Sequence, residues 1–98
     1  MTISNKKILD DFTDRHSDAR SPVNKWIEII ENSNFKSHGD LKAVFRSADY
    51  VGNSRYVFNI KGNKYRFVVF VIFVGGLMDI RFCGTHAEYN TIKKIENI

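Results

Sequence analysis

Residues 55–83, RYVFNIKGNKYRFVVFVIFVGGLMDIRFC, decide the fold of this chain. They hold three apolar runs rich in β-branched and aromatic side chains, which favour strands. Gly62-Asn63 and Gly75-Gly76 separate the runs. Pairs of this kind supply the positive φ angles that two-residue hairpin loops require. The stretch therefore predicts three strands, at residues 55–61, 64–74 and 77–83, in an antiparallel meander.

Two-residue loops also fix which residues face one another across the strands. They place Asn59 opposite Arg66 in the first hairpin, and Phe70 opposite Arg81 and Arg66 opposite Thr85 in the second. One face of the meander then carries no charge, as expected of a core covered by helices. That face comprises Tyr56, Phe58, Ile60, Tyr65, Phe67, Val69, Val71, Phe73, Met78, Ile80 and Phe82.

The opposite face of the meander is cationic. Its predicted members are Arg55, Val57, Asn59, Lys61, Lys64, Arg66, Val68, Phe70, Ile72, Asp79, Arg81 and Cys83, with Thr85 at the border. Like charges at neighbouring cross-strand positions repel each other, so the cluster favours an anionic ligand such as a phosphate backbone. An ordinary solvated face is the alternative interpretation. The apolar residues toward its far end predict that another element or a partner covers part of this face.

Helical periodicity dominates the first half of the chain. Ser4 is expected to cap a first helix whose apolar residues recur at helical spacing. Ser21 and Pro22 form an N-cap and first-turn pair for a second helix, in which Trp26 lies on the apolar stripe. Asp40 is expected to cap a short further turn at residues 41–45.

The end of the chain predicts one more helix. Thr85 and Glu88 form a T-x-x-E capping box, so a short helix should run from His86 to about Ile95. The chain has 98 residues, of which 43% are hydrophobic, enough for one core but not two. We therefore predict a single α+β domain spanning residues 1–98, with N-terminal helices packed on a small antiparallel sheet.

The net charge and the cysteine content indicate the kind of partner and the compartment to expect. Fifteen Lys and Arg against eleven Asp and Glu give a net charge of +4, which suits a polyanionic partner such as nucleic acid. Cys83 is the single cysteine, so a reducing, cytoplasmic compartment is expected. The longest apolar run, Phe67–Val74, is too short to cross a bilayer, and no membrane partner is expected.

The cationic face carries the groups that RNA cleavage needs without a metal. The reaction deprotonates the 2′-OH, neutralises the phosphate and protonates the leaving 5′-oxygen. Arg66 suits the phosphate oxygens, and His86 at the edge of the face suits proton transfer near neutral pH. Tyr89, one turn later, can orient or stack on a base.

Each of these residues also has a structural interpretation. A histidine at a strand–helix junction is often a hydrogen-bonding residue, and Tyr89 is equally consistent with core packing. Cys83 with His86 would make only half a zinc site, and no cofactor is expected. As a thiol beside a helix, Cys83 is more simply a packed residue than a nucleophile.

The segments 56–68 (YVFNIKGNKYRFV) and 80–89 (IRFCGTHAEY) resemble the HigB branch of the RelE-like toxins. The resemblance extends upstream to the helix around Trp26 and to residues 40–49, so it covers most of the chain. It implies a RelE-like fold. The positions that match the motif are Asn59, Lys61, Gly62, Asn63, Tyr65, Arg66, Arg81, Gly84, Thr85, His86 and Tyr89.

The resemblance implies the toxin of a type II toxin-antitoxin system, an mRNA interferase that inhibits translation. Such toxins usually act on the ribosome and are silenced by an antitoxin, here expected to be a HigA-like helix-turn-helix protein. Arg66, His86 and Tyr89 are the expected catalytic residues. The expected RNA-binding residues are Arg55, Asn59, Lys61, Lys64, Arg81 and Thr85.

The chain departs from the family pattern in three places, and the last of them leaves the division of acid and base roles open. The segment around Phe35 to Gly39 differs from the usual tryptophan-containing stretch. Arg46 stands where a proline is common, and Thr85-His86 and Tyr89 stand where better-known RelE-like toxins use an arginine and a late tyrosine. Two rival functions remain. One is a ParE-like toxin that acts on DNA gyrase without cleaving RNA, and the other is a non-catalytic RNA-binding module.

Overall fold

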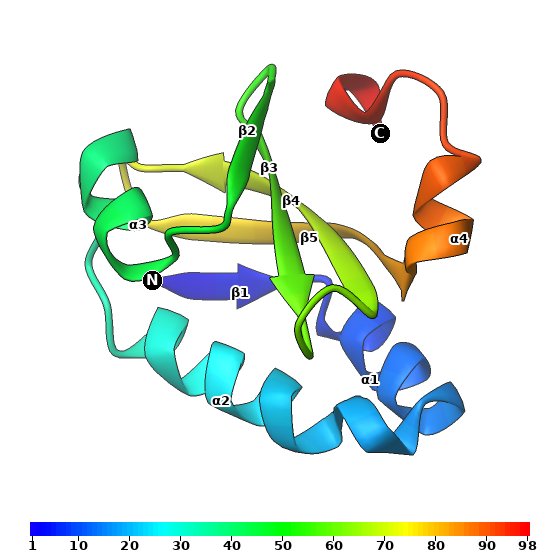
Figure 1. Ribbon diagram of the computed structural model, residues 1–98. Coiled ribbons are helices and arrows are strands. Elements are labelled where there is room, and N and C mark those ends of the chain that lie inside the picture. Colours follow the sequence, from blue (N-terminus) through cyan, green and yellow to red (C-terminus); the bar gives the residue numbers. More distant parts are fainter.

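The computed structural model describes all 98 residues, and its centre is a five-stranded sheet with the order β1-β5-β4-β3-β2 (Figure 1). Only β1 and β5 are parallel, while the other neighbours are antiparallel. The predicted meander is therefore confirmed as β3, β4 and β5. The strands are β1 (Thr2–Ser4), β2 (Asp49–Gly52), β3 (Arg55–Ile60), β4 (Tyr65–Ile72) and β5 (Leu77–Thr85).

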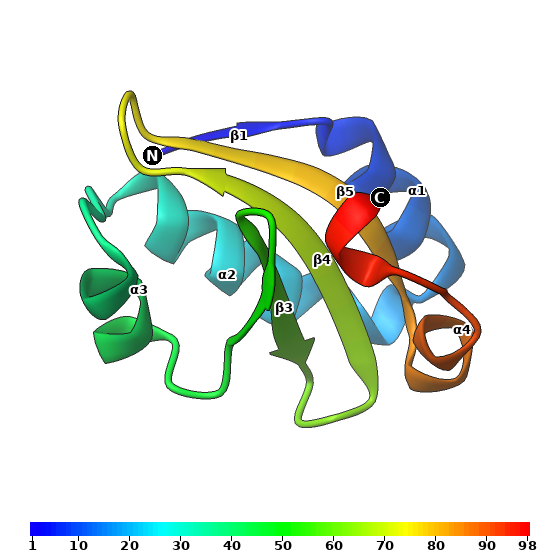
Figure 2. The same ribbon diagram turned by 90° about the horizontal axis from the view of Figure 1, so that it is seen from above.

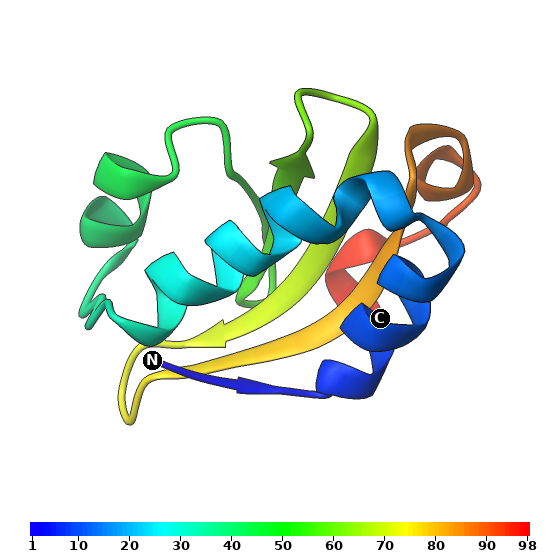
Figure 3. The same ribbon diagram turned by 90° about the horizontal axis from the view of Figure 1, so that it is seen from below.

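Helices cover one face of the sheet, which confirms the predicted α+β class. The two longest, α1 and α2, lie together on one face, and the last residues of the chain lie on the other (Figures 2 and 3). None of the helices has both the length and the apolar character needed to cross a bilayer. The helical elements are α1 (Lys6–Arg15), η1 (Ser17–Ala19), α2 (Arg20–Glu31), α3 (His38–Val44), α4 (His86–Asn90) and η2 (Ile95–Asn97), where η marks a 3₁₀ turn.

The two short edge strands, β1 and β2, were not predicted. The expected cap Ser4 is the last residue of β1, and its hydroxyl donates to Asp79 Oδ1 at 2.6 Å. The helix cap is Asn5 instead, in a left-handed conformation with φ 62. Three residues at an edge carry too little alternation to predict a strand, so the helical pattern after Ser4 dominated the prediction.

The other predicted helix ends also shift. α2 begins at Arg20, directly after η1, so Ser21 lies inside its first turn and is not the N-cap. The cap of α3 is Ser37, whose hydroxyl accepts from the amide of Asp40. The capping box at Thr85 is present as predicted, but α4 ends at Asn90 rather than near residue 95.

The first hairpin has the predicted register and the second does not. Asn59 pairs with Arg66, but Phe70 pairs with Asp79 rather than with Arg81. The second turn takes four residues, 73–76, instead of two. A bulge then leaves Arg81 without a partner across from β4, so that Arg66 pairs with Gly84 and not with Thr85.

The bulge exchanges two predicted faces. Cys83, expected on the cationic face, pairs with Phe67 and lies in the core, while Phe82 pairs with Val68 on the other face. Because side chains alternate along a strand, one extra residue inverts every face beyond it. Both predictions were therefore wrong for one reason, the extra residue at Arg81.

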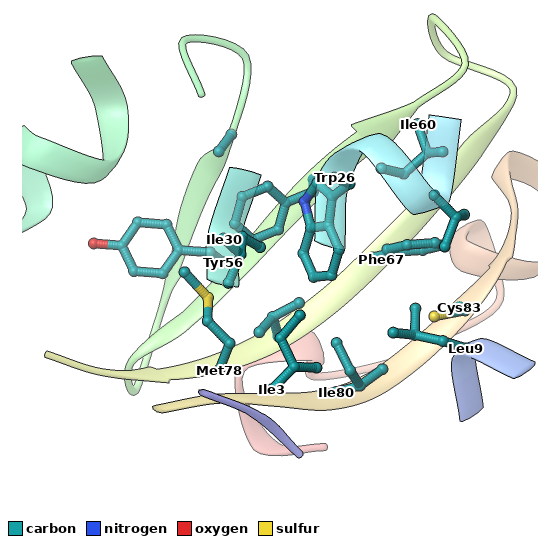
Figure 4. Close-up of a cluster of buried hydrophobic side chains, with 14 of the residues drawn as sticks. Ile3, Leu9, Trp26, Ile30, Tyr56, Ile60, Phe67, Met78, Ile80 and Cys83 are labelled. Atoms are coloured by element: carbon teal, nitrogen blue, oxygen red, sulfur yellow. The ribbon is translucent and has the colours of Figure 1, made fainter. Parts of the chain in front are cut away.

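The core lies between the sheet and the helices (Figure 4). Phe67, with 0% exposure, is its centre. The centre of its ring lies 5.3 Å from that of Phe12 in α1 and 5.5 Å from that of Trp26 in α2, and both contacts are edge to face. Edge-to-face pairs add to the free energy gained by burial alone. Aromatic contacts thus connect both long helices to the middle strand.

Candidate functional site

Arg66 leaves β4 on the sheet face opposite α1 and α2, and neighbouring groups hold its guanidinium. Its Cζ lies 4.8 Å from the ring centre of Tyr89, and Nη2 donates to Asn63 Oδ1 at 3.1 Å. Nε is buried and has no hydrogen-bond partner. A buried donor without an acceptor costs stability unless a ligand supplies one. The guanidinium is therefore held in place by two contacts, while its Nε lacks an acceptor within the chain.

The start of α4 is attached to the end of the β3–β4 hairpin. The amide of His86 donates to the carbonyl oxygen of Lys64 at 3.2 Å. Thr85 and Glu88 make both bonds of the capping box, so the threonine hydroxyl is engaged in capping. The imidazole Nδ1 of His86 lies 3.1 Å from Asn90 Nδ2, and its Nε2 makes no hydrogen bond. The helix thus carries His86 and Tyr89 on one side, at i and i+3.

The strand–helix junction leaves no room for a side chain at Gly84. A Cβ atom there would lie 2.5 Å from Phe82 Cζ and 2.9 Å from Glu88 Oε1. Gly84 is also the residue opposite Arg66 across β4 and β5. The missing side chain at Gly84 therefore leaves the space in which the Phe82 ring and the capping carboxylate of Glu88 lie.

Lys61 and Lys64 share an acid that was not predicted. Asp18 Oδ2 accepts from Lys64 Nζ at 2.7 Å and from Lys61 Nζ at 3.0 Å, and Oδ1 accepts from the Tyr65 hydroxyl at 2.6 Å. The bonds from Lys64, Tyr65 and Lys61, in that order, hold the pKa of Asp18 well below its usual range. The same carboxylate raises the pKa of Lys64. One net positive charge remains on the cluster.

Replacing Asp18 by asparagine is expected to lower the Tm by a few degrees at neutral pH, because Lys61 and Lys64 lose their counter-charge and an amide NH₂ replaces one of the two acceptor oxygens. The pKa in the folded state lies below the ordinary 3.8, so this stabilisation is present above that pH and fades as the pH falls toward the lowered value. Calorimetry should show a Tm difference that is constant between about pH 7 and 5 and shrinks toward about pH 3.

The matched control for this experiment is Asp14→Asn. Asp14 is 71% exposed and pairs only with Arg20, at 3.2 Å. Isolated, exposed ion pairs contribute little to stability, so the Tm of Asp14→Asn should stay near that of the wild type. If the Tm difference for Asp18→Asn did not depend on pH, the ion cluster would not be the source of the stabilisation.

Arg55 and Arg81 form a separate group that holds the end of the chain. Their guanidinium carbons lie 4.6 and 5.8 Å from the centre of the Phe70 ring. The main-chain oxygen of Ile98 accepts from Arg55 Nε and Nη2, at 3.1 and 2.7 Å, and from Arg81 Nε at 3.1 Å. The predicted cover on this face is confirmed, because the residues that follow α4 lie on it (Figure 2).

Seven of the nine predicted site residues thus fall into three groups. Arg66 and Tyr89 are in contact, and His86 lies on the same helix, at the end of the hairpin that carries Arg66. Lys61 and Lys64 are bound to Asp18, and Arg55 and Arg81 are bound to Ile98. Asn59 makes one long contact, from Nδ2 to Ser47 O at 3.5 Å, and Thr85 caps α4.

Sequence reasoning missed Asp18 and Asn90 as neighbours of the site. Asn90 follows His86 by four residues, a spacing that would have indicated contact on a helix. Asp18 lies far away in the sequence and carries no such signal. Cys83 is 5% exposed, and burial raises the pKa of its thiol far above its usual range, so it is not an activated nucleophile. No three His, Cys, Asp or Glu side chains are grouped to hold a metal ion.

A small mixed sheet with a cationic arginine site beside a short C-terminal helix is compatible with the RelE-like fold that the sequence resemblance implies. The family model described as "HigB_toxin, RelE-like toxic component of a toxin-antitoxin system" matches residues 19–92, well over half of the chain. This chain belongs to the HigB toxin family, which confirms the predicted resemblance.

Curated relatives agree with this assignment. The "mRNA interferase toxin HigB" of Escherichia coli K12 is 33% identical over 93 residues, which cover 92% of this chain and 88% of the relative. Proteins named "mRNA interferase HigB" from Escherichia coli O157:H7 and Shigella flexneri match with the same identity and coverage.

Proposed function

We propose that this protein is an endoribonuclease that cleaves mRNA at a phosphodiester held by Arg66 beside α4. The toxin family and the names of the three relatives support the activity, and the prediction of an mRNA interferase is confirmed at that level. The single observation that supports Arg66 as the reaction centre is its buried, unpartnered Nε on a guanidinium already fixed by Tyr89 and Asn63.

In the proposed mechanism the 2′-oxygen of the RNA attacks the adjacent phosphorus. The 2′-OH loses its proton, the P–O5′ bond breaks and the 5′-oxygen gains a proton. Arg66 neutralises the charge that develops on the phosphate oxygens. His86, through its unengaged Nε2, and Tyr89 transfer the protons. The products are a 2′,3′-cyclic phosphate and a 5′-hydroxyl, and no step needs a cofactor.

The RNA path proposed here follows the hairpin end of the sheet. Asn59, Thr85 and the ion cluster of Lys61 and Lys64 lie at that end, near Arg66. Arg55 and Arg81 lie farther along the sheet and are bound to Ile98. RNA bound there would compete with Ile98 for the two guanidinium groups. The residues at the hairpin end are thus the proposed primary RNA contacts. Arg55 and Arg81 are proposed to contact RNA only when Ile98 has released them.

The partners follow in part from the family. A toxic component of a toxin-antitoxin system has an antitoxin as its partner. We propose that the antitoxin is a HigA-like helix-turn-helix protein, that cleavage takes place on the ribosome and that the toxin acts in the cytoplasm. The absence of a disulfide partner for Cys83 is consistent with that compartment.

Primer extension on mRNA in a purified translation reaction, with and without ribosomes, tests the proposal. We expect cuts that depend on ribosomes and are lost in Arg66→Ala and His86→Ala. Chemical analysis should find a 2′,3′-cyclic phosphate and a 5′-hydroxyl at each cut. A 3′-hydroxyl and a 5′-phosphate would disprove the mechanism. Intact mRNA with the wild-type protein would favour gyrase poisoning or simple RNA binding.

A further inference from the structure

A small pocket lies beside the end of β3, between that strand, α2 and the residues that follow α3. Trp26 and Ile29 of α2 supply part of its wall, together with Phe45, whose ring centre lies 5.1 Å from that of Phe58 in β3. The space measures about 180 Å³. Pockets for drug-sized molecules measure about 300–1,000 Å³, so this one suits a single ring system.

The pocket adjoins the proposed cleavage site through Asn59. This asparagine lines the pocket, and it pairs with Arg66 across β3 and β4. Residues that pair across two strands carry their side chains on the same face of the sheet. The Asn59 amide makes one long contact within the chain, from Nδ2 to Ser47 O at 3.5 Å, and its Oδ1 makes none. The pocket therefore opens beside the path proposed for the RNA, next to an amide that is largely free.

A buried donor without an acceptor lies in the wall of the pocket. Trp26 is 4% exposed, and its indole Nε1 has no hydrogen-bond partner. The indole lies among the core side chains (Figure 4). Only one other buried side-chain polar atom in the chain lacks a partner, and it is Nε of Arg66 in the proposed cleavage site. Buried donors are almost always paired, so this indole points to an acceptor that a ligand brings.

The lining of the pocket has the chemistry that holds an RNA base. Phe45 is half-buried and offers part of its ring, and unstacked RNA bases pack on such aromatic rings. Asn59 offers a donor and an acceptor side by side, with which an asparagine pairs with the edge of a base. The charged residues of the lining, Lys25 and Lys61, are both cations, which suits the phosphates on either side of a base.

We propose that this pocket binds one unstacked base of the mRNA, near the phosphate that Arg66 holds. The base packs on Phe45 and Ile29, accepts the indole N–H of Trp26 and pairs with the amide of Asn59. The proposal rests on the proposed function, and it adds a site of base selection to the site of cleavage.

Trp26 is the single tryptophan of the chain, so its indole N–H gives one side-chain signal in a ¹H–¹⁵N spectrum. The probes are short 2′-O-methyl oligonucleotides of uridine, cytidine or adenosine, which lack the attacking 2′-OH and stay intact. The indole signal should move with at least one of them, and its proton should exchange more slowly because it gains an acceptor. A signal that stays in place at saturation with all three would overturn the proposal, as would one that moves equally with inorganic polyphosphate.

Base selection gives a second measurement. The three oligonucleotides should differ in affinity by about tenfold or more, because an amide paired with one base edge rejects a wrong base by about that factor. Asn59→Ala should bring the three affinities within about threefold of one another. The salt dependence of binding should stay the same, since the cations set it. A spread of affinities that survives in Asn59→Ala would overturn the proposal.

Ile29→Glu tests the apolar wall and keeps Trp26 as the reporter. It should weaken binding of the tightest oligonucleotide by about tenfold and stop the movement of the indole signal. Val74→Glu is the matched control, because it makes the same change of charge at a 91% exposed valine outside the pocket. The remaining signals of the spectrum show whether the variant is folded. Wild-type binding in folded Ile29→Glu would overturn the proposal.

Crosslinking in the translation reaction identifies the RNA that supplies the base. On irradiation, 4-thiouridine placed in the mRNA beside the cut should crosslink to the peptide that holds Trp26 or Phe45. A crosslink from the pocket to ribosomal RNA alone, or an indole signal that moves only with the antitoxin, would overturn the proposal. Failure of the wild-type protein to cleave mRNA, while the indole signal still moves with RNA, would count against the proposed function alone.

Discussion

Replacing Arg66 by alanine is expected to lower the rate of mRNA cleavage by about 10²–10³-fold or more. The guanidinium is held by the Tyr89 ring at 4.8 Å and by Asn63 at 3.1 Å, so its donors are fixed before the phosphate arrives. Donors that need no reorganisation stabilise developing charge more than mobile ones. Single-turnover cleavage, followed by primer extension, measures the loss.

Arg66→Lys should recover at most about tenfold of that loss, because an ammonium is a point charge without the planar pair of donors. Arg20→Ala is the matched control. Arg20 is a 57% exposed arginine that pairs with Asp14 on the helical side, and its loss should leave the rate unchanged. If Arg66→Ala cleaved within about threefold of the wild type, another group would have to stabilise the transition state.

Replacing Phe67 by alanine is expected to lower the free energy of unfolding by about 3–5 kcal/mol. The ring has 0% exposure and joins Phe12 and Trp26 through edge-to-face contacts. Its removal leaves a cavity between the sheet and both long helices. Since domains of this size are stable by only about 5–15 kcal/mol, the loss is a large share of the total stability and should lower the urea midpoint strongly. Urea denaturation followed by circular dichroism measures the change.

Val74→Ala is the control for that experiment, because Val74 is 91% exposed at the turn before β5. Its effect should stay within about 0.5 kcal/mol. A loss below about 1 kcal/mol in Phe67→Ala would mean that the helices can close the space, contrary to a tightly packed core.

The first hairpin and the face on which Arg66 lies were predictable because both depend on local rules. Gly62-Asn63 lies at the turn, so the pairing of Asn59 with Arg66 follows from counting outward. The second hairpin defeated the same counting, because the four-residue turn at 73–76 and the bulge at Arg81 carry no composition signal. A register predicted from turn residues alone holds only until the first bulge.

The charge distribution was predicted less well, for a different reason. Alternation correctly placed Arg66 on the outer face, but it said nothing of Asp18, which reaches Lys61 and Lys64 from a 3₁₀ turn more than 40 residues earlier. Nor did it indicate that Ile98 would bind Arg55 and Arg81. Such contacts depend on how separate elements dock. Strand patterns therefore gave the positions of the cations but not their partners.

The single unpaired residue in β5 has a consequence for how the chain leaves the sheet. Arg81 shifts the phase of the strand by one residue, so Gly84 comes to lie opposite Arg66 and the next residues turn into α4. Without that shift Phe82 would point inward and Cys83 outward. The side chains at the end of the strand would then face the opposite way, and α4 would leave on the side of the sheet away from Arg66. One inserted residue thus sets the register in which the chain leaves the sheet, with Tyr89 in contact with Arg66.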